Sequence, residues 1–132
     1  RKPPKEQLPP ANMDDLDDYM ELLYQVGGRT EKEKEQTHAA QVRGTAMILS
    51  LCRNVLNLEQ LIQNGTVMGA LTRVLQEEYK KSVELSFNIL RIFLAFSNFV
   101  EMHPLMGYPQ KYQASEIMPR ARELLLEEEL LL

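Results

Sequence analysis

Apolar residues recur at helical spacing along most of the chain, between short stretches rich in glycine, proline or charge. The pattern predicts helices over residues 14–25, 42–54, 56–64, 66–78, 82–98 and 114–132. No stretch alternates apolar and polar residues between turn signals, so we expect essentially no strand. The fold class predicted by the pattern is all-α.

Residues that start or stop helices set these limits. The acidic run at 14–18 suits the positive end of a helix dipole, and the glycine pair at 27–28 ends the first helix. The Asn-Gly pair at 64–65 tolerates the left-handed conformation and predicts a stop. Thr66 and Ser82 are then expected to cap the two helices that follow.

Two stretches lack an apolar pattern. The first ten residues hold four of the seven prolines together with charge, which predicts a linker or a packed extended arm over residues 1–13. Residues 29–41 alternate in sign, as in the run Glu-Lys-Glu-Lys-Glu, and are expected to form a solvated loop or a frayed helix extension.

The chain also resembles itself after a shift of about 40 residues, in character more than in identity. The shift superimposes Val42 on Val83, Thr45 on Ser86, Ile48 on Ile89 and Leu49 on Leu90. Long helix, short helix, glycine turn and further helix at this period are typical of armadillo or related repeats. We therefore predict an armadillo-type right-handed α-solenoid, of which this chain is a fragment of about two to three repeats.

The repeat divides the chain into four parts. Residues 1–13 form the linker, 14–54 an incomplete repeat with the charged insertion 28–41, 55–98 a complete repeat, and 99–132 the start of a further one. The chain starts with Arg1 rather than Met, so we expect it to be cut from something longer. Such a fragment has apolar ends and is expected to associate or to be marginally stable.

One narrow polar strip interrupts the apolar surface of the helix predicted over 82–98. Its members are Glu84, Asn88, Arg91, Ala95 and Asn98, and the equivalent strip one repeat earlier is Arg43, Met47, Ser50 and Asn54. A helix this apolar is packed between neighbours, so only the strip reaches water.

In armadillo solenoids the closing helices line a concave groove, which makes these strip residues candidates for partner binding. The alternative is that they only form the solvated face of the helix. Within the strip, Asn88 and Arg91 carry the most useful chemistry. An amide can bond a partner's backbone as donor and acceptor, and a guanidinium can pair with a carboxylate through two bonds.

Composition narrows the classes of partner. The net charge is −4 and no basic patch runs along the chain, so we expect no nucleic-acid partner. The longest strictly apolar run in the middle, 92–96, is too short to span a bilayer, so no direct membrane insertion is expected. A single cysteine, Cys52, excludes an internal disulfide, favours a reducing compartment and is expected to be a small buried hydrophobe.

No constellation of residues indicates catalysis. His38 lies in the charged insertion and His103 lies beside a proline, and neither has partners at metal-ligand spacing. The acidic run at 14–18 lacks the glycine and the distal glutamate of a calcium loop, and the glycine pair lacks the lysine of a phosphate loop. We therefore expect no catalytic residue, no metal, no cofactor and no enzyme activity.

Several strings of residues resemble the kinesin-associated protein family. They are YMELLY at 19–24, VRGTAMIL at 42–49, NLEQLIQN at 57–64, GALTRVLQE at 69–77 and SVEL at 82–85. The similarity extends over about residues 14–103. The connection 28–41 looks longer than usual for this family, and residues 108–132 match poorly.

The resemblance implies an armadillo superhelix that is the non-motor subunit of heterotrimeric kinesin-II. It implies binding to the tails of the motor subunits and linkage to cargo or cargo-adaptor proteins, notably in intraflagellar transport. The implied location is cytoplasmic and cytoskeleton-associated, in the cilium or flagellum.

Two other functions compete with this adaptor role. One is a different armadillo scaffold for nuclear import or cell junctions, although the absence of Trp counts against the import version. The other is a helical regulatory domain of a larger enzyme.

Overall fold

The computed structural model describes residues 9–79 and 81–102, and this part of the chain contains helices and connections but no strand. Its elements are the 3₁₀ helix η2 (Met13–Asp15) and the α-helices α1 (Leu16–Leu23), α2 (Glu31–Leu51), α3 (Val55–Gln63), α4 (Gly65–Glu78) and α5 (Val83–Met102). The all-α prediction is confirmed. The linker residues 1–8 and the helix predicted over 114–132 lie outside the described residues.

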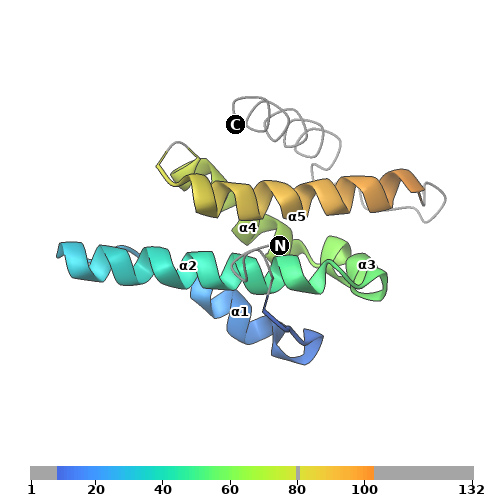
Figure 1. The fold of residues 1–132 in the computed structure, drawn as a ribbon, viewed down its shortest axis with the longest axis horizontal. Coiled ribbons are helices and arrows are strands. Elements are labelled where there is room, and N and C mark those ends of the chain that lie inside the picture. The colour runs from blue at the N-terminus through green and yellow to red at the C-terminus, as the bar shows by residue number, and fades with distance from the viewer. Residues whose placement is uncertain (1–8, 80, 103–132) are drawn as a thin grey trace, which may run out of the picture.

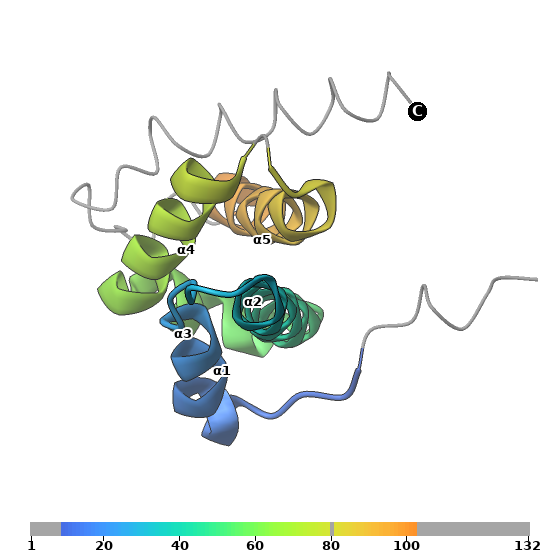
Figure 2. The same ribbon diagram turned by 90° about the vertical axis from the view of Figure 1, so that its left-hand side faces the viewer.

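The helices form two layers (Figures 1 and 2). The long helices α2 and α5 lie side by side, and α1, α3 and α4 cover one flank of this pair. Within the layers α2 packs on α5 and α1 packs on α4, while α3 contacts both α4 and α5. Figure 2 looks along α2 and α5 and shows α1 and α4 stacked beside them.

Hydrogen bonds between α2 and α5 show that the two helices are parallel. His38 Nε2 lies 2.7 Å from Ser82 Oγ, and the Asn88 side-chain amide donates to Thr45 Oγ1 at 3.0 Å. These pairs are separated by 44 and 43 residues in the chain. A constant separation means that both helices advance in the same direction, at nearly the shift that relates the two halves of the sequence.

Of the two alternatives predicted for the charged segment 29–41, the structure shows the helix extension rather than the loop, because α2 begins at Glu31 instead of Val42. Thr30 caps the helix by accepting a hydrogen bond from the Glu33 N–H at 3.1 Å. The Glu33 carboxylate in turn accepts from the Arg29 N–H at 3.0 Å, in a variant of the capping box. Gly28 leaves room for this side chain, since a Cβ there would overlap Glu33.

Two other helix starts test the predicted caps. Asn64, not Thr66, caps α4, because its side chain accepts from the N–H groups of Thr66 and Val67. The predicted stop is confirmed, because α3 ends at Gln63, but Asn64 is extended with φ −85° instead of left-handed and α4 begins at the next residue. Ser82 caps α5 as predicted and accepts from the Leu85 N–H at 3.2 Å.

Helix ends also differ from the prediction. The first long helix, predicted to reach residue 54, ends at Leu51. The second, predicted to end at Asn98, continues to Met102, so the repeat boundary predicted at 98–99 falls within α5. This continuation occurs because Phe99 is buried with the rest of the helix's apolar face.

One hydrophobic core joins all the α-helices. Its largest fully buried side chains include Leu23, Ile48, Leu61, Leu71, Phe93 and Phe96. No buried side-chain polar atom of the described residues lacks a hydrogen-bond partner. Helix α5 is long and apolar enough to span a membrane by length and composition, yet half of the qualifying window is buried inside this core.

Helix α1 packs closely against α2 at Gly44. A Cβ on Gly44 would lie 2.9 Å from the Tyr19 carbonyl oxygen and 3.0 Å from the Leu22 Cβ. Real Cβ atoms are rarely this close to backbone, so any larger residue would force α1 away from α2. Gly69 on α4 has nothing within 4 Å of the same position.

We predict that Gly44→Ala lowers the free energy of unfolding by about 1–2 kcal/mol, because overpacking outweighs the higher helix propensity of alanine. Gly69→Ala is the matched control and should raise stability by about 0.5–1 kcal/mol, since only the propensity term acts there. Urea denaturation followed by circular dichroism measures both. Equal stabilisation of the two variants would contradict the close approach of α1 and α2.

Candidate partner-binding surfaces

The strip residues of α5 fall into two groups. Glu84, Arg91 and Asn98 are exposed, whereas Asn88 is half-buried. The Arg91 guanidinium lies over the Phe87 ring, 5.0 Å from its centroid. This cation–π contact holds the arginine head on an aromatic platform at the surface, where a partner's carboxylate can reach it.

Asn88 contributes to the packing of α5 on α2. Its Nδ2 donates to Thr45 Oγ1 at 3.0 Å and to the Val42 carbonyl at 3.4 Å. Thr45 is fully buried and its hydroxyl lies within donating distance of the carbonyls of Gln41 and Val42. The amide donors that made Asn88 attractive for partner binding are therefore directed at the neighbouring helix.

We predict a coupling energy of about 0.5–1.5 kcal/mol between Asn88→Ala and Thr45→Val in a double-mutant cycle of unfolding free energies. The cycle cancels the separate helix-propensity effect of each substitution. Pairing Asn88→Ala with Gln76→Ala, on the exposed face of α4, provides the control and should give no coupling. A coupling near zero for the first pair would mean that Asn88 does not join the two helices.

The strip residues of α2 lie on a different part of the surface. Arg43 is exposed and Met47 is half-buried, and both line a groove beside α1. Ser50 donates its hydroxyl hydrogen to the Pro9 carbonyl at 2.6 Å, and Asn54 caps α3 by accepting from the Leu56 N–H. Only Arg43 and Met47 are thus brought together in a hollow of the surface.

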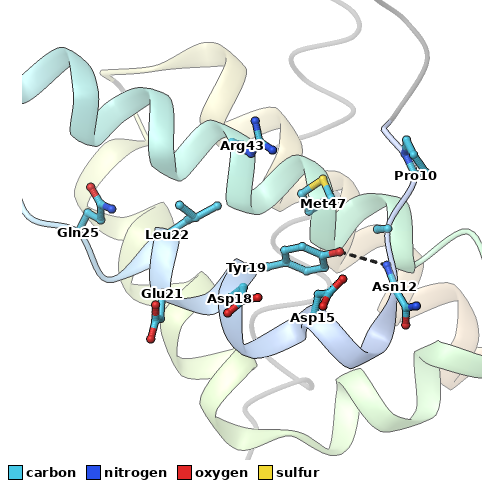
Figure 3. Close-up of a pocket in the computed structure, with 11 residues that line it drawn as sticks. Pro10, Asn12, Asp15, Asp18, Tyr19, Glu21, Leu22, Gln25, Arg43 and Met47 are labelled. Carbon is cyan, nitrogen blue, oxygen red and sulfur yellow. Dashed lines mark hydrogen bonds between the residues drawn. The ribbon is translucent and has the colours of Figure 1, made fainter.

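This groove has a volume of about 860 Å³ and runs between α1, α2 and the extended residues before η2. Figure 3 shows Tyr19, Leu22 and Met47 between Arg43 on α2 and the carboxylates of α1. The extended residues form one wall. They are held by the Ser50 bond to Pro9 and by the Asn12 N–H, which donates to the Tyr19 hydroxyl at 3.1 Å.

The charges of the groove are mostly negative. Asp15, Asp18 and Glu21 line it against a single cation, Arg43, and all four side chains are exposed. Among the residues that the structure describes, no ion pair joins any of these carboxylates to Lys or Arg. The groove was not predicted from the sequence, although positions 15, 18, 22 and 25 have the spacing of one helix face.

A second hollow, of about 490 Å³, lies where the connection after α1 meets α2 and α4. Hydrogen bonds within the chain join the segments that surround it. Thr37 donates to the Val26 carbonyl at 2.8 Å, and Arg73 donates to the Leu23 carbonyl at 3.3 Å. His38 lines this hollow and is bonded to Ser82. In the described part of the chain no three His, Cys, Asp or Glu residues are placed to hold a metal ion.

Cys52 is buried, as the sequence predicts, and burial raises the pKa of its thiol to about 12 by disfavouring the charged thiolate. The thiolate is the reactive form, so the folded chain keeps this cysteine inert near neutral pH.

We predict that Cys52 reacts with a thiol reagent such as dithionitrobenzoate at least about 100-fold more slowly in the native chain than in denaturant at pH 8, because both burial and the raised pKa oppose thiolate formation. Stopped-flow absorbance measurements of thionitrobenzoate release give both rates, and free cysteine in the same denaturant is the control. Equal native and denatured rates would show that the thiol is accessible.

Comparison with known protein families gives a match over most of the chain. The family model described as kinesin-associated protein (KAP) matches residues 5–118 of the 132. The chain belongs to the kinesin-associated protein family. No solved structure matches the chain.

The kinesin-associated match extends beyond the similarity read from the strings of residues. It includes both surfaces described above and spans the charged first half of α2. It also reaches residue 118, so the poor match expected from residue 108 onward is wrong for 108–118. Family membership points to association with kinesin as the general role of the chain.

Proposed function

We propose that this chain is part of a non-catalytic adaptor that binds the tails of kinesin-II motor subunits and links them to cargo or cargo-adaptor proteins. The observation that carries the proposal is the family match over residues 5–118. Adaptors of this kind act through stable association, and their binding energy comes from complementary surfaces rather than from a reactive site.

The helix packing supports an armadillo-type solenoid for this adaptor. Helices α3, α4 and α5 correspond to one repeat, and α1 and α2 to the last two helices of the repeat before it. The pairs α1–α4 and α2–α5 then join equivalent helices of successive repeats, and both pairs are in contact. Stacking of equivalent helices at a constant offset is how solenoids build a continuous core.

The exposed strip of α5 is our candidate for contact with a motor tail. It offers Glu84, Arg91 and Asn98 beside the half-buried Phe87 and Leu94. Arginine and aromatic side chains are enriched in protein interfaces, and arginine is among the residues that dominate their binding energy. The α2 members Arg43 and Met47 lie in the separate groove beside α1 and are not part of this contact.

The cellular setting follows from the same proposal. A kinesin-II adaptor works in the cytoplasm on microtubules, and intraflagellar transport in cilia or flagella is the proposed process. Family membership favours this role over an import or junctional scaffold and over a regulatory domain of an enzyme.

Co-purification tests the proposed function directly. The full chain, extended by its flanking repeats where the parent protein has them, is expressed with the paired tails of a heterodimeric kinesin-II. A stoichiometric complex that survives gel filtration is the expected result. If a folded protein forms no complex with either tail, the motor-binding role is wrong and the helical fold remains.

We predict that Arg91→Glu weakens binding of the motor tails by about tenfold or more, because it reverses a charge that faces the partner and removes the stacked guanidinium. Isothermal titration calorimetry measures the affinity, and circular dichroism should show unchanged helicity because Arg91 is exposed.

Leu90→Ala is the contrasting variant on the same helix. Leu90 is fully buried, so the cavity should cost about 2–5 kcal/mol of stability instead of acting on the interface. If Arg91→Glu lowers helicity as much as Leu90→Ala does, Arg91 is a structural residue and the strip is misassigned.

A further inference from the structure

We propose that the groove between α1 and α2 is a docking site for an amphipathic, positively charged helix of a partner protein. The site is distinct from the strip of α5, and the inference holds whichever protein supplies the helix. It therefore does not depend on the motor-tail assignment.

The shape of the groove favours a helix over a small molecule. Its carboxylates and Arg43 are exposed, whereas small ligands are usually held in sites that bury most of their surface. The stripe from Asp15 through Asp18 to Leu22 covers about two helical turns, or roughly 10 Å. An amphipathic helix can bind in the groove between two helices by placing its apolar side chains into it.

The floor of the groove supplies the apolar contact. Leu22 and Met47 are half-buried and come from the two facing helices, and Tyr19 lies between them with its hydroxyl already bonded to Asn12 (Figure 3). Methionine adapts to apolar side chains of different shape. An incoming leucine or methionine would therefore bury these side chains without leaving a polar group unpaired.

The rim of the groove selects the charge of the partner. Asp15, Asp18 and Glu21 give three negative charges against the one positive charge of Arg43, and none of them is neutralised by an ion pair within residues 9–79 and 81–102. Lysine or arginine residues flanking the partner's apolar stripe would face these carboxylates. A negatively charged helix would be repelled by the same residues.

The other obvious occupant of the groove is a further helical repeat stacked on α1 and α2. The extended residues before η2, which form one wall of the groove, disfavour it. Such stacking joins mostly apolar faces. Here Ser50 of α2 is already hydrogen-bonded to the Pro9 carbonyl, and the neighbouring face of α1 is lined with carboxylates. Charge complementarity therefore favours a separate cationic helix.

The test uses the full 132-residue chain and a fluorescein-labelled peptide of about 14 residues, with leucine at helical spacing and lysine on both sides of the leucine stripe. Fluorescence anisotropy measures its affinity at about 50 and about 200 mM NaCl. We expect saturable binding that weakens with salt, and no binding of the same peptide with glutamate in place of lysine.

Charge-removing variants locate the site. The triple variant Asp15→Asn, Asp18→Asn and Glu21→Gln should lose about tenfold in affinity. The control Glu31→Gln, Glu35→Gln and Glu59→Gln removes the same charge elsewhere and should bind like the unmodified chain. Asp15 makes no side-chain capping bond, so the triple variant should keep its helicity. Arg43→Gln should tighten binding, which a loss of folding cannot mimic.

Two outcomes would overturn the proposal. Equal weakening by the two triple variants would mean that the peptide responds to net charge alone. The second outcome concerns the chain's own residues 1–8, which carry Arg1, Lys2 and Lys5. If deleting them tightens peptide binding by about tenfold or more, the groove is occupied by its own N-terminal segment rather than by a partner.

Discussion

Two adjacent residues of α2 determine how the helices can pack. Gly44 lets α1 approach until its Tyr19 carbonyl would lie 2.9 Å from a Cβ, and Thr45 accepts a hydrogen bond from Asn88 of α5. Successive residues of a helix point about 100° apart, so these two positions define two different faces of α2. A larger side chain at Gly44 would push α1 away from α2, and a larger one at Thr45 would push α5 away from α2.

The register of α2 against α5 explains the difference in composition along both helices. His38 lies beside Ser82, which precedes the first residue of α5. The turns of α2 before His38 therefore extend beyond the N-terminal end of α5 (Figure 1). Residues 31–36 are exposed on all sides and need no apolar face. The other end of α5 extends beyond α2, and there α3 supplies its apolar neighbours.

The offset between α2 and α5 also explains which helices could be predicted from the sequence. Helices with an apolar face, such as α4 and α5, were found within a few residues because burial imposes a helical period on them. The first half of α2 has no buried face and therefore no period, and only the cap formed by Thr30 and Glu33 marks its start. The Asn64 cap was missed because Asn and Thr both suit that role, and the choice depends on where α3 ends.

The candidate surfaces show a similar limit. A polar residue on an apolar helix has the same spacing whether it faces water or a neighbouring helix, so Asn88 and Arg91 could not be separated by sequence. The structure separates them because the Asn88 amide donates to Val42 and Thr45, while Arg91 lies over Phe87 at the surface. The groove could not be predicted either, since it forms only when α1 and α2, separated by a seven-residue connection, pack together.

The two surfaces have opposite chemistry, and this bears on how an adaptor could hold more than one protein. On α5 a stacked arginine and an aromatic ring favour a partner with carboxylates, whereas the groove beside α1 favours a cationic helix. A single partner segment cannot satisfy both surfaces with the same charged face. Two segments of different charge could bind at once without competing, and each would discriminate against the other's site by repulsion. The described helices can in this way carry two specificities, one on α5 and one between α1 and α2.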